Sequence, residues 1–355
     1  MNAAELDYLW LAACAPLSEK ERHAVLRACG RALPPAELEK ICAAVIQSAA
    51  DGVYKGDGAP RAREAEAYLA RLEKAGCFAV TLASADYPAA LRAIPDPPLV
   101  LFCKGRRELL AARKFCIVGA RTIPPWAAKT GTAIAAELAG RFAVVTGIAE
   151  GGDAAVIAGA LPAGSLISVL PCGPDRDYPA AHAALKRQIA QQGLIVSEYP
   201  LGMLPQKFTF HERNRVLAGL SEGVLVLAAG QKSGTLITAD RALAYGRDVF
   251  ALPHNAGAPQ GAGCNELIKQ GAYLCTDAGD VLSMFGMERA ERSAPSLTEQ
   301  EQKMLAVLRG AGEGHAAALA QAAGVPVWEA QATLSSLELK GLAARAGGNM
   351  YTALK

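Results

Sequence analysis

Glycines and polar residues cluster at five places in the middle of the chain, each directly after a short apolar run, and four of the five contain glycine. The segments are Gly119-Ala-Arg-Thr122, Thr146-Gly-Ile-Ala-Glu-Gly-Gly-Asp153, Pro171-Cys-Gly-Pro-Asp-Arg-Asp-Tyr-Pro179, Ser197-Glu-Tyr-Pro200 and Gly230-Gln-Lys-Ser-Gly-Thr235. Glycine lets a backbone approach a phosphate closely, and the free N–H groups at a helix N-terminus attract anions. These turns therefore favour the binding of phosphate groups.

Basic and aromatic residues accompany the turns and suit a single-stranded nucleic acid better than one compact nucleotide, because aromatic rings stack on successive bases. The candidate DNA-contact residues are Gly119, Arg121, Thr122, Gly147, Lys207, Phe210, Arg213, Asn214, Arg215, Lys232, Ser233, Gly234 and Thr235. Some of these positions also have a structural interpretation. Arg213 and Arg215 point to different sides of a helix, so we expect one of them to form a buried ion pair. Arg121 has Glu198 as an alternative partner, and Phe208 and Phe210 are also candidates for the core.

Known catalytic and nucleotide motifs do not match these turns. The Gly119 turn lacks the G-x-G-x-x-G spacing of a dinucleotide site, and the Lys232 turn lacks the first glycine of a Walker A loop. Cys172 opens a segment that resembles half of a zinc-deaminase signature, but Asp175 stands where the second cysteine belongs. These turns therefore contain no motif that indicates a catalytic residue, a metal ligand or a cofactor.

The elements that must position these turns alternate between short apolar strands and amphipathic helices. The expected strands are 115–118, 142–145, 166–170, 194–196, 224–227 and 248–252, and helices are expected at 127–139 and 235–245, among others. Strands that are apolar on both faces and separated by helices predict a mostly parallel, doubly wound α/β sheet. In such a sheet the ligand lies beyond the carboxyl ends of the strands.

Composition divides the chain into four parts. Residues 1–75 predict a small helical domain, and 76–286 predict the extended Rossmann-like domain. Residues 287–294 form a polar linker. Residues 295–355 contain three helical segments and a glycine-rich hairpin signal at 347–349, which together predict a winged helix.

The overall composition excludes several classes of protein. The 355 residues include 36 Lys and Arg against 34 Asp and Glu, so the net charge of +2 excludes a histone-like polycation. The nine cysteines include no Cys-x-x-Cys pair and suit a reducing compartment. We expect a cytoplasmic protein without membrane insertion, because the N-terminus is acidic and no apolar stretch reaches about 18 residues.

The strand-end motifs resemble those of a bacterial family of DNA-processing proteins, DprA, also called Smf. The resemblance covers about residues 80–285 and follows the family's order. The matching segments are Ile117–Arg121, Val145–Ala155, Cys172–Pro179, Ser197–Pro200, Phe210–Ser221, Lys232–Ala239, Gly246–Pro253 and Gly263–Ala272, preceded by Tyr87-Pro88 and Pro97–Phe102.

The resemblance implies a function as well as a fold. It implies a Rossmann-like domain between a helical N-terminal domain, of the SAM or helix-hairpin-helix kind, and a C-terminal winged helix. Members of the family bind and protect single-stranded DNA during natural transformation and help load the RecA recombinase. They act as homodimers without catalysis or a cofactor. By motif match, Arg121 and Lys232 contact phosphates, and Arg213-Asn214-Arg215 shapes a positive pocket.

The chain departs from the family pattern at several positions. Glu150 stands where the family usually has an arginine, and Glu212 lies among the arginines. At an effective dielectric near 20, like charges about 6 Å apart cost roughly 3 kcal/mol, so Glu150 is expected to weaken phosphate binding. The N-terminal block lacks the glycine hairpin of a helix-hairpin-helix. The winged helix has balanced charge, and we expect it to contact protein rather than a DNA groove.

Two alternative functions belong to different classes. The first is a Rossmann-like nucleotide enzyme of the nucleoside monophosphate phosphoribohydrolase type, although the Gly230 turn lacks the paired glycines and the glutamate of that group. The second is a protein-interaction scaffold with weakened DNA binding, which Glu150 and Glu212 suggest. Salt-dependent binding separates DNA recognition from the scaffold.

Overall fold

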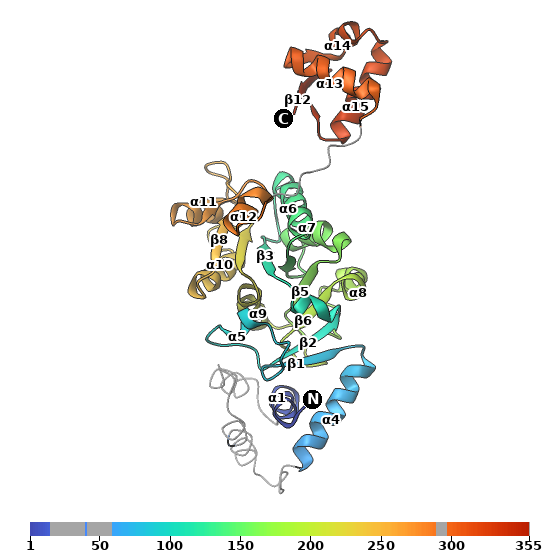
Figure 1. Ribbon diagram of the computed structural model, residues 1–355. Coiled ribbons are helices and arrows are strands. Elements are labelled where there is room, and N and C mark those ends of the chain that lie inside the picture. The colour runs from blue at the N-terminus through green and yellow to red at the C-terminus, as the bar shows by residue number, and fades with distance from the viewer. Residues whose placement is uncertain (15–39, 41–58, 289–296, 355) are drawn as a thin grey trace. The chain divides into compact units, whose positions relative to one another are not determined.

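A computed structural model describes residues 1–14, 40, 59–288 and 297–354 of the chain (Figure 1). These residues form two compact units, Met1–Arg289 and Ala290–Lys355, which are described separately. The predicted linker at 287–294 lies mostly outside the described residues, as does much of the predicted helical domain at 1–75. Among the described residues, no helix is both long and apolar enough to cross a membrane.

The first unit is built on one nine-stranded sheet with the strand order β1-β2-β6-β5-β4-β3-β7-β8-β9. Its strands are β1 (Phe78–Thr81), β2 (Val100–Gly105), β3 (Lys114–Val118), β4 (Ala143–Thr146), β5 (Leu166–Leu170), β6 (Leu194–Ser197), β7 (Gly223–Val226), β8 (Asp248–Ala251) and β9 (Tyr273–Leu274). The seven strands from β6 to β9 in this order are parallel, and β1 and β2 add an antiparallel edge. The parallel part of the sheet begins at β3. From there the chain winds outward through β4 and β5 to β6, and it then returns to β7 on the other side of β3. The sheet is therefore doubly wound, as predicted, and its winding reverses between β3 and β7.

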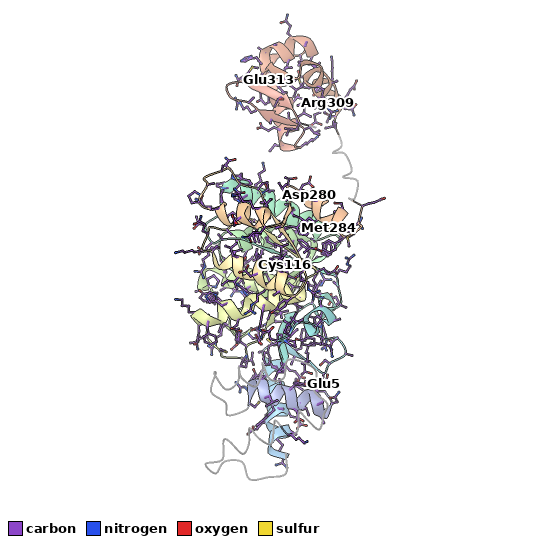
Figure 2. All side chains as sticks on the ribbon, turned by 90° about the vertical axis from the view of Figure 1, so that its left-hand side faces the viewer. Glu5, Cys116, Asp280, Met284, Arg309 and Glu313 are labelled. Carbon is purple, nitrogen blue, oxygen red and sulfur yellow. The ribbon has the colours of Figure 1, made fainter. Side chains whose placement is uncertain are left out.

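Helices cover both faces of the sheet because alternate side chains of each strand point to opposite faces. Phe115 and Ile117 belong to one core with α6 (Pro125–Leu138), α7 (Gly152–Ala160), α8 (Ala183–Gln192) and α12 (Ala278–Met284). Cys116 and Val118 belong to the other core with α9 (Lys207–Leu220), α10 (Gly234–Ala244) and α11 (Ala262–Lys269). Figure 2 shows Cys116 in the middle of this unit, where its side chain is fully buried.

Shorter elements complete the first unit. The helix α5 (Ala89–Arg92) packs against α9, and 3-10 turns lie at Arg107–Leu110, Leu161–Ala163 and Ala180–His182. At the antiparallel edge, α1 (Ala3–Ala13) and α4 (Ala59–Lys74) pack on each other and on β1. The Trp10 indole donates to the Glu64 carboxylate at 2.8 Å, and Ser84 donates to Glu5 at 2.6 Å. The division of this unit at residue 75 stays a prediction, since α1 and α4 share a core with β1 and β2.

The second unit has the three helices and the hairpin that the sequence predicts. Its elements are α13 (Glu299–Ala311), β10 (Glu313–His315), α14 (Ala316–Ala323), α15 (Val327–Leu339), β11 (Ala343–Arg345) and β12 (Met350–Ala353). The three strands form a small antiparallel sheet in the order β10-β12-β11. Thr298 and Glu301 form a capping box at the start of α13. Lys340 forms an ion pair with Glu301, with 2.6 Å between Nζ and Oε2.

Candidate nucleic-acid interface

The carboxyl ends of β3, β4, β5 and β7 meet where the winding of the sheet reverses. In open α/β sheets, ligands bind in the crevice at this point, because the loops on either side run away from each other. Gly119 follows β3 here and touches the start of α7, since a Cβ on Gly119 would lie 2.9 Å from Gly152 Cα. The Gly152 N–H donates to the Ala120 carbonyl at 3.0 Å. The two glycines therefore allow two strand-end turns to pack directly together.

A cavity of about 430 Å³ opens beside these turns. Nine of the predicted contact residues line it: Gly119, Arg121, Lys207, Phe210, Arg213, Asn214, Ser233, Gly234 and Thr235. They come from the turn after β3, from α9 and from the start of α10. The sheet topology thus gathers residues that lie more than 100 positions apart in the sequence.

The helix α9 presents one face to this cavity. Lys207, Phe210, His211 and Asn214 all line it, and their spacing of three and four residues places them on one side of a helix. Gln206 and Thr209 form a reciprocal cap that fixes the start of α9, and the side chain of Lys207 follows directly at the exposed first turn. The helix therefore aligns a cation, an aromatic ring and an amide along the cavity.

The N-terminus of α10 forms the opposite wall. Ser233 caps this helix by accepting from the Thr235 N–H at 3.3 Å, and Gly234 has no atom within 4 Å of where a Cβ would be. Asn214 of α9 donates to the Gly234 carbonyl at 3.2 Å, which ties the two helices together at the cavity. A helix N-terminus with an uncovered glycine beside it is a favourable position for a phosphate.

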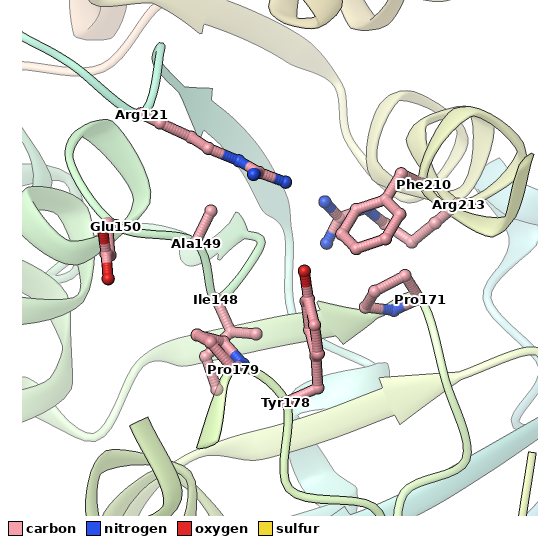
Figure 3. A pocket seen from close by; sticks show the side chains of 9 residues that line it. All are labelled: Arg121, Ile148, Ala149, Glu150, Pro171, Tyr178, Pro179, Phe210 and Arg213. Atoms are coloured by element: carbon pink, nitrogen blue, oxygen red, sulfur yellow. The ribbon is translucent and has the colours of Figure 1, made fainter. Parts of the chain in front are cut away.

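A smaller cavity of about 130 Å³ adjoins the first and is more apolar (Figure 3). Its walls are Ile148, Ala149, Pro171, Tyr178, Pro179 and Phe210, with Arg121, Glu150 and Arg213 at its border. The Tyr178 and Phe210 rings meet edge to face with 5.4 Å between centroids, and the Arg121 guanidinium carbon lies 5.7 Å from the Phe210 centroid. Figure 3 shows the Arg121 side chain extending toward Phe210 and Arg213. Arg121 itself is exposed and forms no ion pair with the described residues.

Arg213 and Asp153 lie buried beneath the two cavities. Arg213 donates to the Val169 carbonyl, and the Asp153 carboxylate accepts from the Ala149 N–H at 3.1 Å. Burial lowers the pKa of Arg213 and raises the pKa of Asp153, and in each case the charge of the other residue opposes the shift. Gly147 lies against both, since a Cβ there would be 2.2 Å from Asp153 Oδ2. Gly147 is therefore a packing residue beneath the cavities, not a part of their lining.

Arg215 is the arginine that forms the buried ion pair. Its guanidinium donates to the Glu198 carboxylate and to the Asp96 carbonyl, and both Arg215 and Glu198 side chains are only 4% exposed. This pair also occupies Glu198, so Glu198 is not the partner of Arg121. Arg213 and Arg215 diverge, as the helical spacing predicts. The prediction of Arg215 as a DNA contact was wrong, because its side chain is enclosed and lines neither cavity.

The two acidic departures from the family pattern do not point into the cavities. Glu212 turns toward Arg215, with 3.8 Å between Oε2 and Nε. Glu150 is exposed at the border of the smaller cavity, and Figure 3 shows its carboxylate directed away from Arg121 and Phe210. Solvent screens such an exposed charge strongly, so the cost expected from the sequence alone is reduced here.

The remaining predicted residues lie outside the cavity linings. Thr122 and Lys232 are exposed on the turns next to Arg121 and Ser233. Conversely, Tyr178 was missed as a site residue although its motif, Cys172–Pro179, was recognised. Its position opposite Phe210 becomes apparent only in the folded structure. Within the described ranges, no group of three or more His, Cys, Asp or Glu residues is placed to hold a metal ion.

Family models and curated relatives match most of the chain. The model for DNA recombination-mediator protein A matches residues 78–286, and the model for the DprA winged helix domain matches residues 288–349. The DNA processing protein DprA of Streptococcus pneumoniae is 41% identical over 200 residues, which are 56% of this chain and 71% of that protein. Protein Smf of Escherichia coli is 36% identical over 297 residues, covering 80% of this chain and 79% of that protein.

Solved structures of related proteins share the fold. The crystal structure of DNA processing protein A from S. pneumoniae matches with a TM-score of 0.64 and 31% identity, over 80% of this chain and 98% of that one. A structure of DNA processing protein A from Helicobacter pylori, described for its single-stranded DNA binding mode, matches with a TM-score of 0.53 and 33% identity, over 58% of this chain and 95% of that one. Sequence motifs, topology and both domain models agree, and this chain belongs to the DprA (Smf) family of DNA-processing proteins.

Proposed function

We propose that this protein binds single-stranded DNA, without catalysis, at the carboxyl edge of its parallel sheet. The observation that carries the proposal is the pair of adjoining cavities, one lined by cations and a helix N-terminus and the other by aromatic and proline side chains. Together they suit a chain of alternating phosphates and bases. The single-stranded DNA binding mode described for the related H. pylori protein supports the same assignment.

Phosphates fit the larger cavity. Lys207 of α9 and Arg121 of the turn after β3 supply positive charge, and the first turn of α10 adds the backbone N–H group of Gly234. Contacts of this kind are independent of base sequence, because every nucleotide carries the same phosphate. Thr122 and Lys232, exposed on the adjacent turns, extend the positive and polar surface along the strand.

A base fits the smaller cavity. Tyr178 and Phe210 offer ring edges and faces to a flat heterocycle, while Ile148 and Pro171 close the apolar side. The Arg121 guanidinium lies over Phe210, so it stacks on the ring while its N–H groups face a phosphate next to the base. Stacking on aromatic rings is sequence-tolerant, which predicts weak dependence on base sequence.

In the cell, we propose that this binding protects incoming strands during natural transformation and presents them to the RecA recombinase. The protein then acts in the cytoplasm. Protection from a single-strand nuclease and faster RecA filament formation on coated DNA are the two activities to measure. A protein that binds the strand but leaves both unchanged would contradict this role.

We further propose that the protein acts as a homodimer. The edge strand β9 exposes Tyr273 and Leu274, and Leu243 of α10, which packs on β8 next to β9, is 56% exposed. An edge strand with exposed apolar side chains pairs readily with another copy. Sedimentation at the monomer mass of 36.8 kDa over the whole micromolar range would contradict this.

Fluorescence anisotropy of a labelled oligo-dT tests the DNA proposal. We expect tighter binding to single than to double strands, and a steep loss of affinity between about 50 and 200 mM salt, because counterions are released from each contacted phosphate. A nucleoside monophosphate should compete poorly, since it brings only one phosphate to the larger cavity and none of the further contacts along a strand. Binding of the monophosphate but not of oligo-dT would instead favour a nucleotide enzyme, and no binding of either would favour a scaffold.

A further inference from the structure

A tryptophan lies on the surface at the carboxyl edge of the sheet, outside both cavities. Trp126, in the first turn of α6, is 47% exposed. Its ring stands against the His254 imidazole, with 4.8 Å between centroids and 59° between planes. A large aromatic side chain gains much free energy from burial, so a half-exposed ring has surface left for a second flat partner.

His254 is held rigidly beneath this ring. Its Nε2 lies 2.9 Å from the Leu227 carbonyl oxygen, and its backbone N–H donates to Asn265 Oδ1 at 3.0 Å. The backbone of Gly261 lies against the imidazole, since a Cβ on Gly261 would be 2.0 Å from His254 Cγ. Because the imidazole has no room to move away, the Trp126 ring is supported in advance of any ligand, and a preorganised surface costs less entropy on binding.

The Trp126–His254 pair adjoins the larger cavity through β7. Leu227, whose carbonyl contacts His254, continues β7 and donates its N–H to the Val118 carbonyl at 2.9 Å. Gly119, which lines the cavity, would carry a Cβ only 3.4 Å from Leu227 Cβ. From β4 beside the smaller cavity to β8 before His254 there are three strand spacings, or about 14 Å. At about 3.4 Å per nucleotide in a stacked strand, this is roughly four nucleotides, and fewer in an extended one.

The charges around the pair favour a polyanion. Lys129 follows Trp126 by three residues on α6, which places it on the same side of the helix, and it is exposed. The segment from Asn255 to Gly261, which follows His254, contains no acidic residue. A DNA strand that leaves the larger cavity toward β8 therefore meets an aromatic face with a cation beside it.

We propose that Trp126, supported by His254, is a stacking platform for one further base of the bound strand. The inference rests on the proposed binding of single-stranded DNA and assigns that binding a third subsite. Stacking between a base and an aromatic side chain is sequence-tolerant, so this subsite lengthens the footprint without adding base specificity.

Intrinsic fluorescence reports on Trp126 directly. The chain has three tryptophans, of which Trp10 is buried and Trp328, in the winged helix, is 72% exposed. In a Trp328→Phe background, titration with a twelve-nucleotide oligo-dT should quench the remaining exposed tryptophan. Adding Trp126→Phe should abolish the quenching while anisotropy still reports binding, because phenylalanine keeps a stacking ring.

Affinity gives a second and independent readout. Trp126→Ala should weaken binding of the twelve-nucleotide strand about tenfold, and Trp126→Phe by no more than about threefold. For a dinucleotide, which fills only the cavities, Trp126→Ala should change nothing. The matched control is Trp328→Ala, which removes the other exposed tryptophan, from the second unit, and should leave both affinities unchanged.

The outcomes separate this inference from the proposed function. If the twelve-nucleotide strand binds wild type and Trp126→Ala equally and quenches nothing, the third subsite is overturned and the two-cavity proposal stands. Equal losses for the dinucleotide and the longer strand would also overturn it, since they would indicate damage to the cavities. If wild type binds no oligo-dT even at low salt, both proposals fail.

Discussion

Replacing Arg121 with alanine should weaken binding of single-stranded DNA while leaving the fold intact. Arg121 is exposed, and its guanidinium carbon lies 5.7 Å from the centroid of the Phe210 ring. An exposed cation–π contact contributes about 0.5–1 kcal/mol, so Arg121→Ala should lower the free energy of unfolding by no more than that. Because the guanidinium borders both cavities, its loss removes a phosphate contact and part of the aromatic wall together.

The loss of affinity follows from the contact that disappears. A hydrogen bond to a charged group contributes about 1.5–3 kcal/mol. Its loss should therefore raise the dissociation constant roughly ten- to hundredfold. One phosphate contact fewer also lowers the slope of log K against log salt by about 0.7 for a single strand. Anisotropy titrations of oligo-dT at four or more salt concentrations measure both quantities. Arg121→Lys should keep the slope but lose part of the affinity, because lysine retains the charge without the planar stack.

Arg141 provides the matched control for this prediction. It is also exposed, but it lies just before β4, at the amino ends of the parallel strands and therefore at the edge of the sheet opposite the cavities. Arg141→Ala changes the net charge by the same amount and should leave affinity and salt slope within about twofold. Equal losses for the two variants would show that the protein responds only to net charge, and an unchanged Arg121→Ala would refute the assignment of the cavities.

The remaining predictions concern buried charge. Arg215→Met should destabilise the protein by about 3–5 kcal/mol in urea unfolding, because it leaves the Glu198 carboxylate buried without its cation, and adding Glu198→Gln should recover part of the loss. A loss below about 1 kcal/mol would contradict the importance of this pair. Burial lowers the pKa of Lys114 to about 8 from an ordinary 10.5, so between these values the unfolded chain binds more protons and the stability contribution of Lys114 rises with pH by about 3 kcal/mol. Lys114→Met should remove that rise across pH 8–10.5. If the free energy of unfolding depends on pH in the same way for both proteins, burial does not lower the pKa of Lys114.

Local sequence patterns determined most of the sheet. The six predicted strands all occur, because runs such as 115–118 and 166–170 are apolar on both faces and only a sheet covered on both sides buries them. The antiparallel edge was not predicted. Its strand β2 pairs with β6, more than 80 residues further along the chain, and no local pattern encodes that pairing. The two-residue strand β9 is exposed and too short to carry a periodic signal.

The sequence by itself also determined which turns carry glycines and cations, and that α9 sends Arg213 and Arg215 in different directions. Only the tertiary structure decided which arginine faces the cavities, because that depends on Glu198 and Asp96, which come from other parts of the chain. The same holds for Tyr178, which meets Phe210 through the packing of two distant segments. Periodicity fixes the face of a helix on which a residue lies, whereas the neighbours that this face meets are set by long-range packing.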